Sequence, residues 1–204
     1  YLVIRKKVRT EFAQKLPTPD KNEKTPVVIT YHELLEKVQR LPVTTELQIR
    51  NQALLWFLLE TGCLVSELCE LRFEAIDSEK NSIQIGVKNP RTIKVSAELM
   101  DRLEDLKALT SKKSPWIFLG YNRHGSLGGA ISPRGVELLV KSYASFLGYE
   151  DLTPRLLRHS RVYEWLKQNT SRENIKSWLG LQSDYAFKVY EPLIKSNLEA
   201  TSNT

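Results

Sequence analysis

The sequence is poor in the residues that bind metals or form disulfides. It contains 2 cysteines and 3 histidines in 204 residues. Cys63 and Cys69 form no CxxC pair and lie in a segment of strongly helical character, with few histidines elsewhere to complete a ligand set. We therefore expect two reduced, buried thiols and no metal site.

Long apolar runs are also absent. The stretch ALLWFLL at 53–59 is bounded by Gln52 and Glu60, so it is far shorter than the roughly 20 residues that a membrane-spanning helix needs. The N-terminal residues are charged and contain no signal-peptide core. These absences exclude an integral membrane protein from our expectations and favour a cytoplasmic one.

What is present is the composition of an ordinary globular protein with excess positive charge. Hydrophobic residues make up 41% and charged residues 26% of the chain, which excludes disordered and fibrous classes. The 30 Lys and Arg against 24 Asp and Glu give a net charge of +6 and a pI near 9.2. This balance favours a polyanionic partner such as nucleic acid.

The pattern of the chain predicts one mainly helical domain. Residues 1–25 form a basic segment and a proline-containing linker, 26–198 the domain and 199–204 a tail. Helical periodicity, caps and stop signals predict helices over 30–41, 44–61, 66–71, 97–109, 133–149, 153–166, 172–179 and 184–200. The alternation at 81–96 predicts a hairpin, and 114–132 a strand running into a glycine-rich loop. The expected fold class is mixed α/β, mainly helical with one small antiparallel sheet.

The stretch LTPRLLRHSRVYEWL at 152–166 concentrates positive charge on a predicted helix. Thr153 and Pro154 are typical of a helix start. The three-residue spacing of Arg155 and Arg158 places both guanidiniums on one face. Taken alone, this face could be a solvated surface with ordinary ion pairs.

Three ordered motifs resemble the tyrosine recombinase (phage integrase) family. TGCLVSELCELRFEAID at 61–77 is similar to the family's first box, T-G-x-R-x-S-E-L-x-x-L. TPRLLRHS at 153–160 resembles the second box, H-x-L-R-H, and WLGLQSDYAFKVY at 178–190 resembles L-G-H followed by the terminal tyrosine. The likeness extends over about residues 26–198, which implies the recombinase catalytic fold without the family's N-terminal DNA-clamping domain.

The resemblance implies an enzyme that cuts and rejoins double-stranded DNA through a phosphotyrosine, with no metal or nucleotide cofactor. Such chemistry needs a tyrosine nucleophile, cations for the transition-state oxygens and an acid for the leaving oxygen. By position, Tyr190 matches the nucleophile, Arg158 the second arginine and Lys88 the hairpin lysine. The residues that we expect to contact DNA are Arg155, Arg158, Lys88, Arg91 and Arg161.

Three family positions are changed in this chain. Leu64 stands at the first arginine, Arg155 at the first histidine of the second box, and Leu181 at the histidine of L-G-H. Loss of one preorganised donor to a transition-state oxyanion costs about 10²- to 10³-fold in rate. Loss of an acid/base group costs about 10²- to 10⁴-fold, and arginine cannot take that role because it does not deprotonate. We expect impaired or absent cleavage.

The matched residues also have simpler interpretations. Tyr190 lies among apolar neighbours and could be a core tyrosine, and Lys88 beside an Asn-Pro pair could be a solvated turn residue. His159 could serve only as a local hydrogen-bonding partner.

Three functional hypotheses remain open at this point. The first is a DNA-binding protein with impaired cleavage that serves DNA recombination, integration or a derived regulatory role, and in which Arg155 partly replaces the guanidinium missing at Leu64. The second is an active recombinase that uses Tyr190, and the third is a protein-interaction module that keeps only the fold. Leu193, Ile194 and Leu198 follow a helical spacing, so the C-terminal helix can pack on its own domain. The resemblance to the family implies instead that this segment docks on a neighbouring protomer, which is the basis for expecting self-association through the C-terminal helix.

Overall fold

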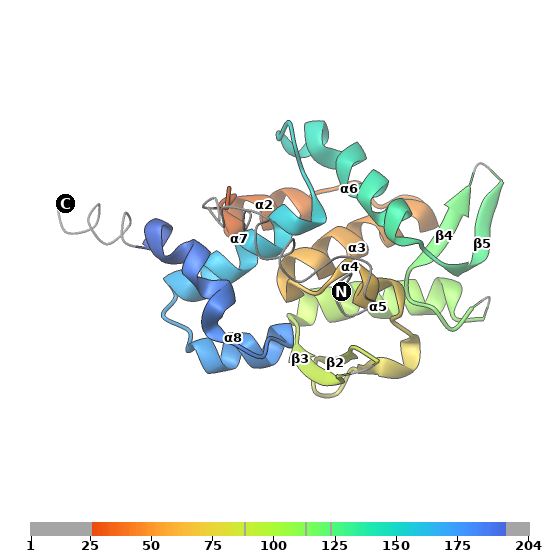
Figure 1. The fold of residues 1–204 in the computed structure, drawn as a ribbon. Coiled ribbons are helices and arrows are strands. Elements are labelled where there is room, and N and C mark those ends of the chain that lie inside the picture. The colour runs from red at the N-terminus through yellow and green to blue at the C-terminus, as the bar shows by residue number, and fades with distance from the viewer. Residues whose placement is uncertain (1–25, 88, 113, 123, 195–204) are drawn as a thin grey trace, which may run out of the picture.

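The helix α3 forms the centre of the fold, and the other elements surround it (Figure 1). The computed structural model describes residues 26–87, 89–112, 114–122 and 124–194. The α-helices are α2 (Tyr31–Gln39), α3 (Glu46–Thr61), α4 (Val65–Cys69), α5 (Ala97–Thr110), α6 (Pro133–Leu147), α7 (Pro154–Lys167) and α8 (Arg172–Leu179). The 3₁₀ helices are η1 (Phe73–Ala75) and η2 (Asp184–Tyr190). The strands are β1 (Ile76–Asp77), β2 (Ser82–Ile85), β3 (Arg91–Lys94), β4 (Leu119–Asn122) and β5 (Gly125–Ala130).

Local signals determine where α3 begins and ends, and burial holds it in place. The Thr45 side chain accepts a hydrogen bond from the Gln48 N–H, and the Gln48 side chain accepts one from the Thr45 N–H. Gly62 ends the helix in the left-handed conformation, with φ of 59°. Between these ends the helix is buried nearly all round, as expected for a helix that crosses the middle of a core.

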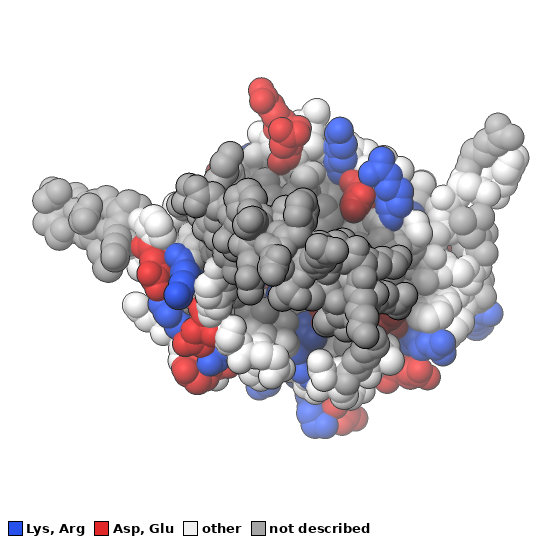
Figure 2. Space-filling model, in the orientation of Figure 1, with Lys and Arg blue, Asp and Glu red and all other residues white. Residues whose placement is uncertain are grey.

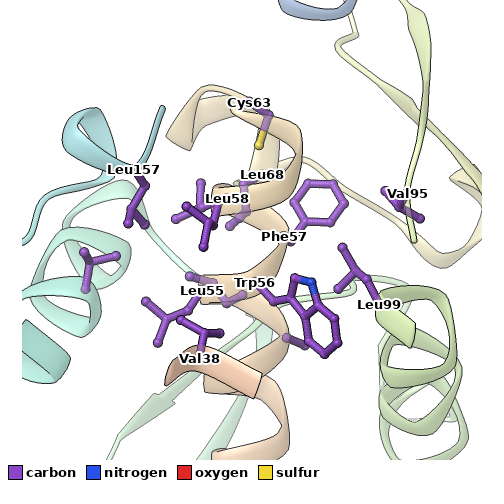
Figure 3. Packing of buried hydrophobic residues seen from close by; sticks show 14 of the residues in the cluster. Val38, Leu55, Trp56, Phe57, Leu58, Cys63, Leu68, Val95, Leu99 and Leu157 are labelled. Carbon is purple, nitrogen blue, oxygen red and sulfur yellow. The ribbon is translucent and has the colours of Figure 1, made fainter. Parts of the chain in front are cut away.

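The packing around α3 joins its neighbours into one core (Figure 3). Phe57 and Leu58 are no more than 1% exposed, and side chains from the surrounding helices and from the start of α5 meet them. Burying a side chain of this size contributes roughly 1.5–3 kcal/mol. Helices α2, α5 and α7 all pack against α3, so the core fixes their relative positions.

The expected hairpin at 81–96 is confirmed as part of a three-stranded antiparallel sheet in the order β1-β2-β3. Ile83 pairs with Ile93, and both side chains point into the core with Ile85. The turn between β2 and β3 contains Lys88, which lies outside the described residues.

The structure corrects two local expectations. The glycine-rich segment expected to be a loop forms β5, which pairs antiparallel with β4, so the described residues contain a second small sheet. Pairing with β4 supplies hydrogen bonds that outweigh the low strand propensity of glycine. The segment before Tyr190 is a 3₁₀ helix rather than an α-helix. Its buried side chains, Phe187 and Tyr190, lie three residues apart, which matches three residues per turn.

The helix start expected at Thr153 is confirmed. The Thr153 hydroxyl accepts a hydrogen bond from the Leu156 N–H at 3.1 Å, and Pro154 occupies the first helical position of α7. Thr30 stands at the N-cap of α2 as expected, but its side chain makes no capping hydrogen bond. In the described part of the chain, no helix has both the length and the apolar character needed to cross a membrane.

One partly buried ion pair connects the sheet to the helices on both sides of it. Arg91 on β3 donates two hydrogen bonds to Glu67 on α4, at 2.6 and 2.9 Å, and its Nε–H donates to the Trp178 carbonyl of α8 at 2.6 Å. Glu67 also accepts a hydrogen bond from the Leu64 N–H at 2.8 Å. Burial alone would raise the pKa of Glu67, but the hydrogen bonds from Arg91 and Leu64 outweigh it and lower the pKa below its ordinary value.

We expect the Glu67→Gln variant to lose about 3 kcal/mol of unfolding free energy at pH 7, because it leaves the charge of Arg91 partly buried without a carboxylate. A lowered pKa in the folded state means that this stabilisation is present above the ordinary glutamate pKa of 4.5 and is lost as the pH falls below it. Chemical denaturation at pH 7 and at about pH 3 measures both effects. Glu74→Gln is the matched control, since the ion pair of Glu74 with Arg72 is long and exposed. An equal loss for both variants would contradict the assignment.

Candidate active site

The two boxes recognised in the sequence meet across one pocket of about 470 Å³. One wall comes from the connection between α3 and α4, and the other from the first turns of α7. The residues that line the pocket are Cys63, Leu64, Val65, Ser66, Pro154, Arg155, Arg158 and His159. The end of α3 and the capped start of α7 thus bring two segments together that lie about 90 residues apart in the chain. These segments are 63–66 and 154–159.

Arg158 is held in this pocket by the end of α3. Its Nη1 donates a hydrogen bond to the Gly62 carbonyl. A Cβ at Gly62 would meet Leu179 and Arg158 only at ordinary contact distances of 3.4 and 3.8 Å, so it is the left-handed turn that favours glycine here. Burial lowers the pKa of Arg158 from its usual value, and nearby groups partly oppose this, but the guanidinium remains charged.

Tyr190 reaches the pocket through His159. The Tyr190 hydroxyl lies 2.5 Å from His159 Nδ1, and Arg155 Nε–H donates a hydrogen bond to His159 Nε2 at 3.1 Å. Burial raises the pKa of Tyr190 to about 12, although the charges of Arg158 and Arg155 act in the opposite direction. Burial and the same two arginines lower the pKa of His159. At neutral pH, His159 is therefore a neutral imidazole beside a neutral phenol.

The changed family positions give the pocket an incomplete set of donors. Leu64 is 48% exposed in the pocket wall and offers neither charge nor a hydrogen bond. Leu181 packs against the hydrophobic core at the position of the L-G-H histidine. Among the described residues that line this pocket, Arg155 and Arg158 are the cations.

Arg91 and Arg161, both expected to contact DNA, are half-buried and make contacts within the protein. The Arg91 side chain is 10% exposed, and Glu67 and Trp178 accept its hydrogen bonds. The Nε–H of Arg161 donates to the Glu60 carbonyl at 2.9 Å, and its guanidinium lies over the rings of Tyr31 and Trp165. Lys88, which was also expected to contact DNA, lies outside the described residues.

Sequence reasoning missed the two contacts that organise the site. Glu67 belongs to the first box, but nothing in that motif alone pointed to Arg91 as its partner. The position of His159 directly after Arg158 was visible in the sequence, whereas its contact with Tyr190 was not, because 31 residues separate them.

Where described residues are visible on the face seen in Figure 2, their Lys and Arg side chains form no continuous positive patch. Around the rim of this face, the described Lys and Arg side chains alternate with Asp and Glu.

Cys63 and Cys69 are free thiols, and burial raises the pKa of Cys63 to about 12. No cluster of three or more His, Cys, Asp or Glu side chains suited to a metal ion occurs within the described ranges.

The chain is similar in sequence to known tyrosine recombinases. Tyrosine recombinase XerC of Roseiflexus castenholzii is 28% identical over 206 residues, a match that covers 95% of this chain and 63% of the relative. Tyrosine recombinase XerA of Pyrococcus furiosus is 27% identical over 193 residues, covering 93% and 65%. The chain thus spans slightly less than two thirds of the length of these relatives.

Solved structures share the fold. The crystal structure of XerA recombinase superposes with a TM-score of 0.72 at 20% identity, covering 91% of this chain and 65% of that one. XerH site-specific recombinase bound to palindromic difH substrate, in its post-cleavage complex, gives 0.74 at 20% identity, covering 91% and 55%. Residues 30–195, most of the chain, match the phage integrase family. The protein therefore belongs to the phage integrase family.

Proposed function

We propose that this chain is the catalytic-domain part of a tyrosine-recombinase-like protein that binds double-stranded DNA in the cytoplasm and cleaves it poorly or not at all. The observation that carries the proposal is the pocket in which Arg155 and Arg158 lie opposite Leu64. The relatives named above are recombinases, and the XerH structure contains its DNA substrate.

The two arginines favour binding of a backbone phosphate. Each guanidinium can present up to five N–H donors, and the planar fork suits bidentate contact with phosphate oxygens. Arg158 donates one hydrogen bond to the Gly62 carbonyl and Arg155 donates one to His159, so N–H donors remain on both guanidiniums. The contact with Gly62 and the one with His159 also preorganise the two side chains, which lowers the entropy lost on binding.

The wall formed by Leu64 argues against efficient cleavage. Attack by Tyr190 on a phosphodiester would build negative charge on the phosphate oxygens, which the family stabilises with a further arginine. Leucine leaves that charge without a donor on this side of the pocket, at a cost of about 3–4 kcal/mol in the activation free energy. Arg155 lines the same pocket as Leu64, which supports a partial replacement of the missing guanidinium.

A second candidate, an active recombinase, is favoured by one observation. The Tyr190 hydroxyl is directed to His159 and lies near the pocket rather than elsewhere in the core. A hydroxyl next to a hydrogen-bonding partner supports this candidate, because nucleophilic catalysis requires such a pair. The reaction itself would need no cofactor.

Self-association through the C-terminal helix is a further part of the proposal. Leu193 and Ile194 pack partly buried against the domain's own core, and Leu198 lies outside the described residues. The packing of Leu193 and Ile194 supports the presence of a short apolar segment here, and we propose that a second copy of the chain docks on it.

We expect Arg155→Gln to weaken DNA binding and to reduce the slope of log affinity against log salt concentration by about one, because one phosphate contact and its counterion release are lost. Titration of fluorescent duplex DNA at several salt concentrations measures both values. Lys167→Gln is the matched control, because it removes one positive charge from the exposed far end of the same helix. Binding that does not respond to salt in the unmodified protein would instead support a protein-interaction module.

We expect Leu64→Arg to raise covalent adduct formation by about 10²- to 10³-fold, because it restores a donor to the transition-state oxygens. The assay counts SDS-resistant complexes with genomic fragments that the protein has retained. Leu64→Met is the size-matched control without charge, and Leu64→Arg combined with Tyr190→Phe should abolish the adduct. Equal adduct levels for the unmodified protein and Leu64→Arg would mean that cleavage is not impaired at this position.

A further inference from the structure

Arg155, His159 and Tyr190 form a continuous chain of hydrogen-bonding groups. The first link joins Arg155 Nε to His159 Nε2 at 3.1 Å, and the second joins His159 Nδ1 to the Tyr190 hydroxyl at 2.5 Å. Arg155 and His159 lie four residues apart on α7, one helical turn, so the helix itself sets the first link. Tyr190 comes from η2.

The direction of the first link is determined by chemistry. Arginine carries five N–H donors, has no acceptor and does not lose its charge in proteins. His159 Nε2 must therefore offer a lone pair to Arg155. A neutral imidazole has one N–H and one lone pair, so the proton must be on Nδ1. The same nitrogen faces the Tyr190 oxygen, which then accepts a hydrogen bond from it.

We propose that Arg155 is a positioning residue that fixes the tautomer of His159 and makes it a hydrogen-bond donor to the Tyr190 oxygen. The inference deepens the proposed function, on which it rests for the role of Tyr190 as the nucleophile. In this arrangement His159 cannot accept the tyrosine proton, because one nitrogen already bears a proton and the other is occupied by Arg155. It stabilises negative charge on the tyrosine oxygen instead.

The charges around His159 are consistent with a neutral imidazole. Arg155 and Arg158 from α7 both disfavour its protonation, as does burial, and together they lower its pKa. Tyr190 faces it from η2, and Asp151 and Tyr185 share with it the wall of a second pocket of about 600 Å³. A histidine at position 155, as in the family, could donate or accept and would not impose one tautomer.

Nitrogen-15 NMR of the imidazole rings tests this assignment without DNA. The protein has three histidines, so single substitutions of His32 and His124 identify the His159 signals, and those two rings serve as internal references. At about pH 8, well above the ordinary histidine pKa, long-range proton–nitrogen correlations distinguish the two neutral tautomers. We expect the Nδ1–H form for His159 in the unmodified protein. The Nε2–H form would overturn the proposal.

Two substitutions at Arg155 separate positioning from simple packing. Arg155→Leu keeps an apolar stem but has no donor, so we expect His159 to shift to the Nε2–H tautomer and to accept a hydrogen bond from Tyr190. Arg155→Lys keeps a charged donor, so the Nδ1–H signature should be retained. An unchanged tautomer in Arg155→Leu would show that Arg155 does not fix it. These spectra need neither DNA nor cleavage, so they report the tautomer even if the chain does not bind or cleave DNA. Likewise, an unexpected tautomer would not contradict DNA binding.

Discussion

The crossing of α3 and α7 at Gly62 is the constraint on which the site depends. Arg158 donates to the Gly62 carbonyl and Arg161 to the Glu60 carbonyl, so the carbonyls at the end of α3 hold two turns of α7. These carbonyls have no partners within their own helix and would otherwise need water or a cap. The arginines thus satisfy the helix end, and the same contacts bring Arg155 and His159 to face Leu64.

A second level of order comes from Glu67 and Arg91. This pair joins the first box to the β2–β3 sheet, and the Trp178 carbonyl extends the connection to α8, the helix that precedes the tyrosine segment. Removal of two charges from water is costly and is offset only when geometry and hydrogen bonds are good. The pair of Arg91 and Glu67 meets both conditions. Its main effect is to fix the relative positions of β3, α4 and α8.

Much of this arrangement could be predicted from the sequence, for identifiable reasons. Thr153, Pro154 and Gly62 act locally, so the limits of α3 and α7 followed from capping chemistry. The ordered boxes predicted which segments would share a site. Sequence could not show that Arg91 faces Glu67 or that His159 faces Tyr190, because these partners are set by packing between distant segments. It also mistook β5 for a loop, since glycine propensity does not reveal a pairing strand.

Under the proposed function, Tyr190 has two roles that compete. It is 4% exposed and, with Phe187, supplies the buried side chains that hold the 3₁₀ helix η2 on the domain. Such helices have poorer hydrogen-bond geometry than α-helices, so η2 depends on these anchors more than an α-helix would. A tyrosine that leaves its place to meet DNA removes one anchor of its own segment. Local unfolding of η2 and exposure of the Tyr190 hydroxyl are therefore thermodynamically coupled, so the contacts that hold η2 in place also control access to this hydroxyl.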